Sequence, residues 1–185
     1  MIYVIDHKDS FTHNVVHQLS LFDKVECDDF SKINKSKLNQ ASTIVFSPGP
    51  GSPKDYPLSS KIYKQFKGKK KIIGICLGFQ QILFSEGAKI VQQNKIYHGF
   101  QSEIQVINKN SIFKNKLKFK VGRYHSLKLK EPFSAKNFDI TMRCVISGAA
   151  MSFENNVDKI YGFQFHPESF LTINGKILIK KILSA

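Results

Sequence analysis

The chain has 185 residues, of which 42% are hydrophobic, and no long apolar run, which predicts one soluble domain over residues 1–185 and excludes a membrane span. Its three cysteines, Cys27, Cys76 and Cys144, follow no disulfide or Cys-x-x-Cys pattern, so we expect a reducing cytoplasm and neither a metal nor another cofactor. The formal net charge of +14 is nearly all scattered lysine, with one run at 69–71 that a solvated loop explains, so we expect no nucleic-acid partner.

Two short apolar runs near the start of the chain predict buried strands. Ile2–Ile5 is the first, and a helical pattern that Asp9 or Ser10 can cap follows it. A less regular stretch over 27–39 separates this helix from the second run, Thr43–Phe46. This order of strand, helix and strand is typical of an α/β fold.

A loop rich in proline and glycine follows the second run, with the sequence Ser47-Pro48-Gly49-Pro50-Gly51-Ser52-Pro53. Ligands of α/β proteins gather at the carboxyl ends of strands, where this loop begins. Proline stiffens such a loop, while glycine lets backbone N–H groups approach a ligand closely. We therefore expect Gly49, Pro50 and Gly51 to contact a ligand, and an oxyanion is a ligand that needs such donors.

A cysteine between two glycines marks the next junction of strand and helix. Lys71–Ile75 reads as a buried strand and Leu77–Ala88 as a helix, with Cys76 on the turn between Gly74 and Gly78. This spacing is typical of a nucleophile elbow, in which small neighbours let strand and helix pack around an exposed nucleophile. The positive end of the helix dipole would favour the thiolate. The alternative is a small buried cysteine in an ordinary connection.

The two halves of the chain differ in their patterns. A helical segment at 58–66 continues the alternation of strand and helix in the first half, which predicts a doubly wound, mostly parallel sheet. From residue 88 to about 160, short runs such as 103–106 and 138–141 predict a smaller antiparallel β region. An amphipathic helix over 172–183 is expected to cover the sheet.

A possible partner for the cysteine lies near the carboxyl end of the chain. Tyr161–His166 alternates like a strand, and Glu168 follows its histidine by two residues. Extended residues two apart face the same way, so Glu168 could bond one imidazole nitrogen of His166. The other nitrogen could then take a proton from Cys76, as in known nucleophile–base–acid triads.

Four motifs, read together and in order, are similar to those of the class I glutamine amidotransferases: Ser47-Pro-Gly-Pro-Gly-Ser-Pro, Gly74-Ile-Cys-Leu-Gly-Phe-Gln, Arg123-Tyr-His-Ser-Leu and His166-Pro-Glu-Ser. They span nearly the whole chain. Within that superfamily, the segments 4–12 and 97–99 resemble the small subunits that serve anthranilate synthase and aminodeoxychorismate synthase.

The resemblance implies a role for each matching residue. Cys76 attacks the side-chain amide of L-glutamine, His166 acts as general base and then acid, and Glu168 orients it. The backbone N–H groups of Leu77 and Gly51 stabilise the oxyanion. The substrate-binding residues that it implies are Gly49, Pro50, Gly51, Gln80, Ser126 and Leu127.

The resemblance also implies a partner, a chorismate-using synthase subunit that receives the ammonia. Overall similarity favours aminodeoxychorismate synthase, with anthranilate synthase, one subunit shared by both, or a non-catalytic regulatory subunit as alternatives. The chain departs from the family pattern at Phe79, where histidine is usual, which leaves the packing there and a partner contact open. It departs again at His7 and Lys8, where Asn-Tyr is common, and these two residues are a candidate synthase interface.

Overall fold

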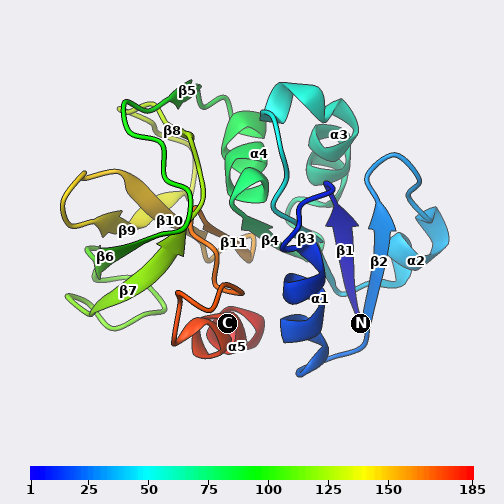
Figure 1. The fold of residues 1–185 in the computed structure, drawn as a ribbon. Helices are drawn as coiled ribbons and strands as arrows, with labels where there is room; N and C mark the ends of the chain where they lie inside the picture. The colour runs from blue at the N-terminus through cyan, green and yellow to red at the C-terminus, as the bar shows by residue number, and fades with distance from the viewer.

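A nine-stranded sheet runs through the protein, whose computed structural model describes residues 1–185 (Figure 1). From β2 to β11 neighbouring strands are parallel, and from β11 to β7 they are antiparallel. In spatial order the strands are β2 (Val25–Asp29), β1 (Ile2–Asp6), β3 (Thr43–Phe46), β4 (Lys71–Ile75), β11 (Ile160–Phe163), β10 (Ala150–Asn155), β9 (Asp139–Cys144), β6 (Phe100–Val106) and β7 (Lys118–Arg123). A separate antiparallel pair joins β5 (Ile90–Gln92) to β8 (Leu127–Leu129).

This arrangement confirms the predicted α/β class with a parallel core and an antiparallel second half. The antiparallel strands continue the same sheet, because β10 pairs directly with β11. The parallel strands β3 and β4 are buried on both faces apart from the half-buried Lys71, which is why 44–46 and 72–75 are unbroken apolar runs.

Helices cover both faces of the sheet (Figure 1). On one face lie α1 (Thr12–Ser20) and α5 (Gly175–Ser184), whose apolar side chains belong to a cluster of 22 buried residues. On the other face lie α2 (Lys35–Gln40), α3 (Pro57–Phe66), which follows the short 3₁₀ turn η1 (Pro53–Asp55), and α4 (Leu77–Ser85), in a cluster of 18. None of these helices combines the length and apolar character needed to cross a bilayer.

The prediction of a less regular stretch over 27–39 was wrong, because this part of the chain contains most of β2 and all but the last residue of α2. The strand β2 lies at the edge of the sheet, half-buried along its length, and carries acidic side chains in place of an apolar run. The helix α2 has only 6 residues, and the side chain of Asn34 caps it by accepting a hydrogen bond from the Lys37 N–H at 3.1 Å. Only Leu38 is buried in α2 and no residue is fully buried in β2, so neither element shows the repeated apolar positions from which a helix or strand is predicted.

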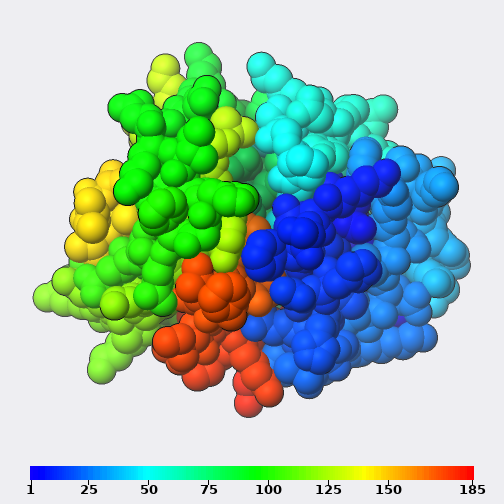
Figure 2. Space-filling view, in the orientation of Figure 1, coloured from blue at the N-terminus to red at the C-terminus, as the bar shows by residue number.

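Two local predictions also need correction. The N-cap residue of α1 is Phe11, and neither Asp9 nor Ser10 caps the helix. The Asp9 carboxylate instead accepts the Phe11 N–H at 2.8 Å, before the helix begins. The strand β11 ends at Phe163, so His166 lies beyond it, in an isolated β-bridge to Gly122 from which a turn begins. Figure 2 shows this late segment, in orange, between the blue N-terminal elements and the green second half.

Candidate active site

Cys76 lies on the sharp turn between the carboxyl end of β4 and the start of α4. Its backbone has φ 52° and ψ −101°, a left-handed conformation that L-residues rarely adopt. The neighbouring chain is tightly packed: a Cβ atom added at Gly78 would lie 2.1 Å from the carbonyl oxygen of Phe46, and one at Gly74 would lie 2.4 Å from that of Gly78. The two glycines are therefore required by close backbone approach, and they hold the cysteine in its strained turn.

His166 and Glu168 form a buried pair beside this cysteine. Nδ1 of His166 lies 2.6 Å from Oε1 of Glu168, and the side chains are 1% and 0% exposed. Burial by itself lowers the pKa of His166, but the Glu168 carboxylate and Cys76 raise it well above its ordinary value. Because Nδ1 donates to Glu168, the buried Nε2 atom, which no hydrogen bond within the chain engages, is left free for proton exchange.

A turn, rather than a strand, brings the pair together. The Ser169 N–H donates to the carbonyl of His166 at 3.2 Å, so the chain reverses around Pro167. The backbone of His166 is also bound to β7, since its N–H donates to the carbonyl of Gly122 at 3.1 Å. The rings of Phe11 and Tyr124 lie 5.2 and 5.0 Å from the imidazole and cover it. The geometry expected from an extended strand is thus reached by a different backbone path.

A cavity of about 230 Å³ opens beside Cys76, smaller than the roughly 300–1,000 Å³ of pockets for drug-sized ligands. It brings together every predicted contact from the three separate motifs: Gly49, Pro50, Gly51, Cys76, Leu77, Gln80, Ser126 and Leu127. Asp9, Tyr124 and His125 line it as well, and sequence analysis did not assign them to the site. Each lies inside a motif that the resemblance used, which is the signal that could have identified them.

The predicted oxyanion loop faces the start of α4. Leu77 is the first residue of that helix, so its N–H has no intrahelical acceptor. Gly51 has φ +72°, which favours glycine. At Gly49 a Cβ atom would lie 2.5 Å from both Leu77 Cδ2 and His7 Cβ, so the loop is packed closely on both sides.

His7 is not part of an exposed interface, which corrects the sequence prediction. It is 0% exposed, with Nδ1 3.2 Å from the Ser47 carbonyl oxygen and Nε2 2.9 Å from the Ser59 hydroxyl. Burial lowers its pKa to about 4. The imidazole is therefore neutral at pH 7 and ties the loop after β3 to α3, whereas Lys8 is exposed and pairs with Asp29 at 3.1 Å.

Gln164 belongs to the site although sequence analysis did not single it out. Its Nε2 atom donates to Cys76 Sγ at 3.8 Å, and its Oε1 atom accepts from Gln80 Nε2 at 3.0 Å. Gln80 Nε2 also donates to the carbonyl of Leu127 at 3.4 Å. The alternating pattern around Gln164 resembled an ordinary strand, so no sequence signal marked it.

A buried arginine supports the segment that ends at Leu127. Arg123 has no carboxylate partner, and its guanidinium carbon lies 3.4 Å from the centre of the Tyr97 ring. Arg123 Nε donates to His125 Nε2 at 3.0 Å, which leaves His125 Nδ1 to donate to the Leu127 carbonyl at 2.8 Å. Burial, with the charge of Arg123, lowers the pKa of His125 to about 3, so this histidine is neutral and fixes the position of Leu127.

Phe79, where the family usually has histidine, points into the core. The side chain is fully buried, and its ring lies 5.2 Å from that of Phe153 on β10. A role in contacting a partner is therefore ruled out for Phe79 in this fold.

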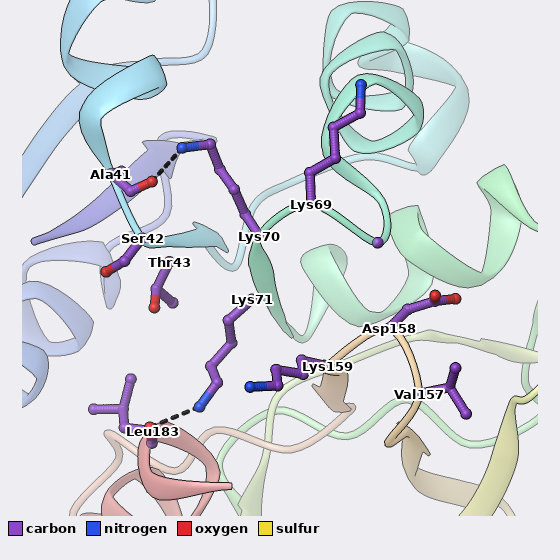
Figure 3. A pocket seen from close by; sticks show the side chains of 11 residues that line it. Ala41, Ser42, Thr43, Lys69, Lys70, Lys71, Val157, Asp158, Lys159 and Leu183 are labelled. Carbon is purple, nitrogen blue, oxygen red and sulfur yellow. Dashed lines mark hydrogen bonds between the residues drawn. The ribbon is translucent and has the colours of Figure 1, made fainter.

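A larger cavity, of about 660 Å³, lies at the opposite end of the parallel strands from Cys76, beside the amino ends of β3 and β4 (Figure 3). Two of its four ammonium groups donate to the main chain: Lys70 Nζ to the carbonyl of Ala41, and Lys71 Nζ to that of Leu183 at 2.7 Å (Figure 3). The prediction of a solvated loop was thus wrong for Lys70 and Lys71, which are half-buried. It is confirmed for Lys69, which is exposed. The cavity is separate from the chemistry around Cys76.

Comparison with known proteins gives a consistent result. A family model described as glutamine amidotransferase class-I matches residues 3–185. The anthranilate synthase component 2 of Lactococcus lactis is 38% identical over 188 residues, covering 100% of this chain and 94% of that protein. The aminodeoxychorismate/anthranilate synthase component 2 of Bacillus subtilis is 33% identical over 186 residues, covering 99% and 95%.

Solved structures agree with the fold. A structure from Thermoplasma acidophilum superposes with a TM-score of 0.84 at 22% identity, covering 99% of this chain and 92% of that one. A glutamine amidotransferase from Thermotoga maritima superposes with a TM-score of 0.77 at 15% identity, covering 99% and 96%.

Proposed function

Since this chain belongs to the class I glutamine amidotransferase family, we propose that Cys76, His166 and Glu168 are its catalytic triad. The observation that carries the proposal is the 2.6 Å hydrogen bond between His166 and Glu168, with the pKa of His166 raised beside a cysteine on a strained elbow. A raised histidine pKa beside a thiol favours the imidazolium–thiolate pair, and the thiolate is the nucleophilic form.

The proposed reaction has two stages. The Cys76 thiolate attacks the side-chain amide carbon of L-glutamine, and the imidazolium of His166 gives its proton to the departing nitrogen. Ammonia leaves, and a γ-glutamyl thioester remains on Cys76. His166 then takes a proton from water, and the resulting hydroxide attacks the thioester carbon. The C–S bond breaks to return the Cys76 thiolate beside the His166 imidazolium, and the carboxylic acid that leaves ionises to glutamate.

We assign the remaining site residues by their places around the cavity. The N–H groups of Leu77 and Gly51 stabilise the oxyanion of both tetrahedral intermediates, each of which places negative charge on the former carbonyl oxygen. Gly49, Pro50, Gln80, Ser126 and Leu127 line the cavity and bind the rest of the glutamine. Its volume of about 230 Å³ suits a ligand of amino-acid size.

We propose anthranilate synthase as the partner that receives the ammonia. The Lactococcus lactis relative carries the name of its component 2, and the two chains match over nearly their full lengths. This reverses the preference for aminodeoxychorismate synthase that overall resemblance suggested. That enzyme, or a subunit shared by both, is the second candidate, because the Bacillus subtilis relative carries both names.

Three further points belong to the same proposal. Residues 1–185 act as one amidotransferase domain, since the family model matches 3–185. A reducing cytoplasm suits its three free cysteines, Cys27, Cys76 and Cys144. A purely regulatory subunit would have no need of the hydrogen-bonded histidine and glutamate beside Cys76.

The test is ammonia transfer with purified anthranilate synthase component 1 and chorismate. We expect Cys76→Ser to abolish anthranilate formation from glutamine while leaving formation from ammonium salts unchanged, because only ammonia production needs the thiolate. Cys27→Ser, which alters a half-buried thiol on β2, is the matched control and should retain both activities. Equal loss of both activities in Cys76→Ser would contradict the proposal.

A second measurement addresses the partner. Glutamate release is followed for the chain alone, with anthranilate synthase component 1 and with aminodeoxychorismate synthase component 1, each with chorismate. We expect slow release alone and more than about tenfold stimulation by the first partner, which needs only about 1.4 kcal/mol of differential stabilisation. Stimulation by aminodeoxychorismate synthase alone would reverse the choice of partner. A full rate of glutamate release without any partner would contradict the expectation that the synthase activates this chain.

A further inference from the structure

We propose that Gln164 is a positioning residue that sets the hydrogen bonding of both the nucleophile Cys76 and the cavity residue Gln80. Its side chain is 0% exposed and lies between the two. One amide thereby joins the elbow to the wall of the cavity. The role assigned to Gln80 toward substrate rests on the proposed glutaminase function, whereas the role toward Cys76 does not.

The first half of the proposal concerns the sulfur atom. Gln164 Nε2 donates to Cys76 Sγ at 3.8 Å, and both residues are buried. A hydrogen bond to an ionised acceptor is roughly twice as strong as one to a neutral acceptor, and burial enhances the difference. Gln164 therefore stabilises the thiolate relative to the thiol and holds the sulfur in one direction.

The second half concerns the orientation of the Gln80 amide. Its Nε2 atom donates to Gln164 Oε1 at 3.0 Å and to the Leu127 carbonyl at 3.4 Å, which uses both of its hydrogens. Its Oε1 atom has no hydrogen-bond partner within the chain, so it is the part of the amide available to a ligand in the cavity that Gln80 lines. Gln164 thus makes Gln80 present an acceptor, which selects a ligand with an N–H donor such as the ammonium or carboxamide group of glutamine.

The backbone around Gln164 makes this arrangement rigid. The Phe163 carbonyl accepts the Cys76 N–H at 2.8 Å, and the Gln164 N–H donates to the Met151 carbonyl at 2.9 Å. The stretch that carries Gln164 is therefore fixed to the elbow on one side and to β10 on the other. Because this backbone is already fixed, the Gln164 side chain can hold the sulfur atom in place without a large loss of conformational entropy when a ligand binds.

Two substitutions separate the two halves. Gln164→Glu keeps an acceptor for Gln80 but removes the donor to sulfur and adds negative charge beside it. Gln164→Leu removes both hydrogen bonds at similar volume. The matched control is Gln81→Leu. Gln81 follows Gln80 in α4 and is as buried as Gln164, but its amide donates to the Ser60 hydroxyl at 2.7 Å and does not line the cavity.

The first readout is alkylation of Cys76 by iodoacetamide as a function of pH, with mass spectrometry separating its peptide from those of Cys27 and Cys144. We expect the pH midpoint to rise by about one unit or more in Gln164→Glu and by less in Gln164→Leu. Gln81→Leu should leave it unchanged. An unshifted midpoint in folded Gln164→Glu would overturn the role toward sulfur, and this readout needs neither glutamine nor a partner, so it stands even if the proposed activity fails.

The second readout is the KM for glutamine in the complex with the synthase partner. Gln164→Leu should raise it by about fivefold, the loss of about one hydrogen bond, while Gln164→Glu changes it by less than about twofold. Equal KM values in the wild type and Gln164→Leu would overturn the role toward Gln80. If Gln164→Leu does not fold, the unbranched Gln164→Met variant replaces it in the same comparison.

Discussion

Nδ1 of His166 and Oε1 of Glu168 are 2.6 Å apart, within side chains that are 1% and 0% exposed. A carboxylate at this distance from an imidazole fixes the tautomer with the proton on Nδ1 and stabilises the imidazolium. The second carboxylate oxygen, Oε2, is buried with no hydrogen-bond partner. The charge of Glu168 is therefore directed almost entirely at His166.

The two residues should contribute unequally to turnover. We expect Glu168→Gln to lower kcat by about tenfold to a hundredfold and His166→Ala by about 10³–10⁴-fold, because orienting a base is worth less than the base itself. Glutamate release in the presence of the synthase partner measures both. The control is Glu103→Gln, which changes a carboxylate that is exposed to solvent and should retain wild-type turnover. Identical losses in the two triad variants would assign Glu168 a different role.

The elbow should tolerate no side chain at Gly78. Gly78→Ala places a Cβ atom 2.1 Å from the Phe46 carbonyl oxygen, so β3 and α4 must separate, at a cost of about 3 kcal/mol or more in the free energy of unfolding. In Gly87→Ala the added Cβ atom has no neighbour within 4 Å. The expected loss in the free energy of unfolding is therefore only about 1 kcal/mol, caused by the positive φ of +90°. Urea denaturation of both variants checks the difference. Equal midpoints would show that the helix can move away from the strand freely.

Acid should weaken the fold partly through His7. The folded pKa is lowered from 6.5 to about 4, so as pH falls below 6.5 the unfolded chain binds a proton that the native imidazole refuses. Stability is then present above pH 6.5 and decreases toward pH 4, by about 3 kcal/mol for this residue. His7→Asn should show a shallower loss between pH 7 and 4.5 in urea denaturation. The exposed His13 provides the control variant His13→Asn, and parallel curves for His7→Asn and the wild type would contradict this account.

Restoring the usual family histidine at Phe79 should harm the protein. Phe79→His would bury an imidazole beside Phe153 without a hydrogen-bond partner, which costs about 1–3 kcal/mol of stability. Phe79→Leu, which stays apolar, should cost less. Thermal unfolding measures both, and kcat/KM per folded molecule should stay within about twofold of the wild type. A gain in kcat/KM for Phe79→His would show that this position acts on catalysis.

The sequence by itself determined the parts of the protein that local pattern encodes. The unbroken apolar runs at 44–46 and 72–75 predict buried parallel strands, because such strands are covered on both faces. The glycines around Cys76 predict a strained turn, since only glycine permits the close approach found there. Four motifs in order were enough to predict the family and most of the residues that line the cavity, though not Asp9, Tyr124 and His125.

Only the tertiary structure decided which side chains are covered and what they touch. His7 was expected at an interface and is buried against Ser59, 52 residues away. Gln164 gave no signal, yet it reaches Gln80, 84 residues earlier in the chain. Such contacts depend on how helices pack on the sheet, and the periodicity of a segment reports which of its own faces is apolar but not which distant residue will meet it. The contacts of Gln164 with Cys76 and Gln80 therefore form only where the fold brings β4, α4 and the segment after β11 together in space.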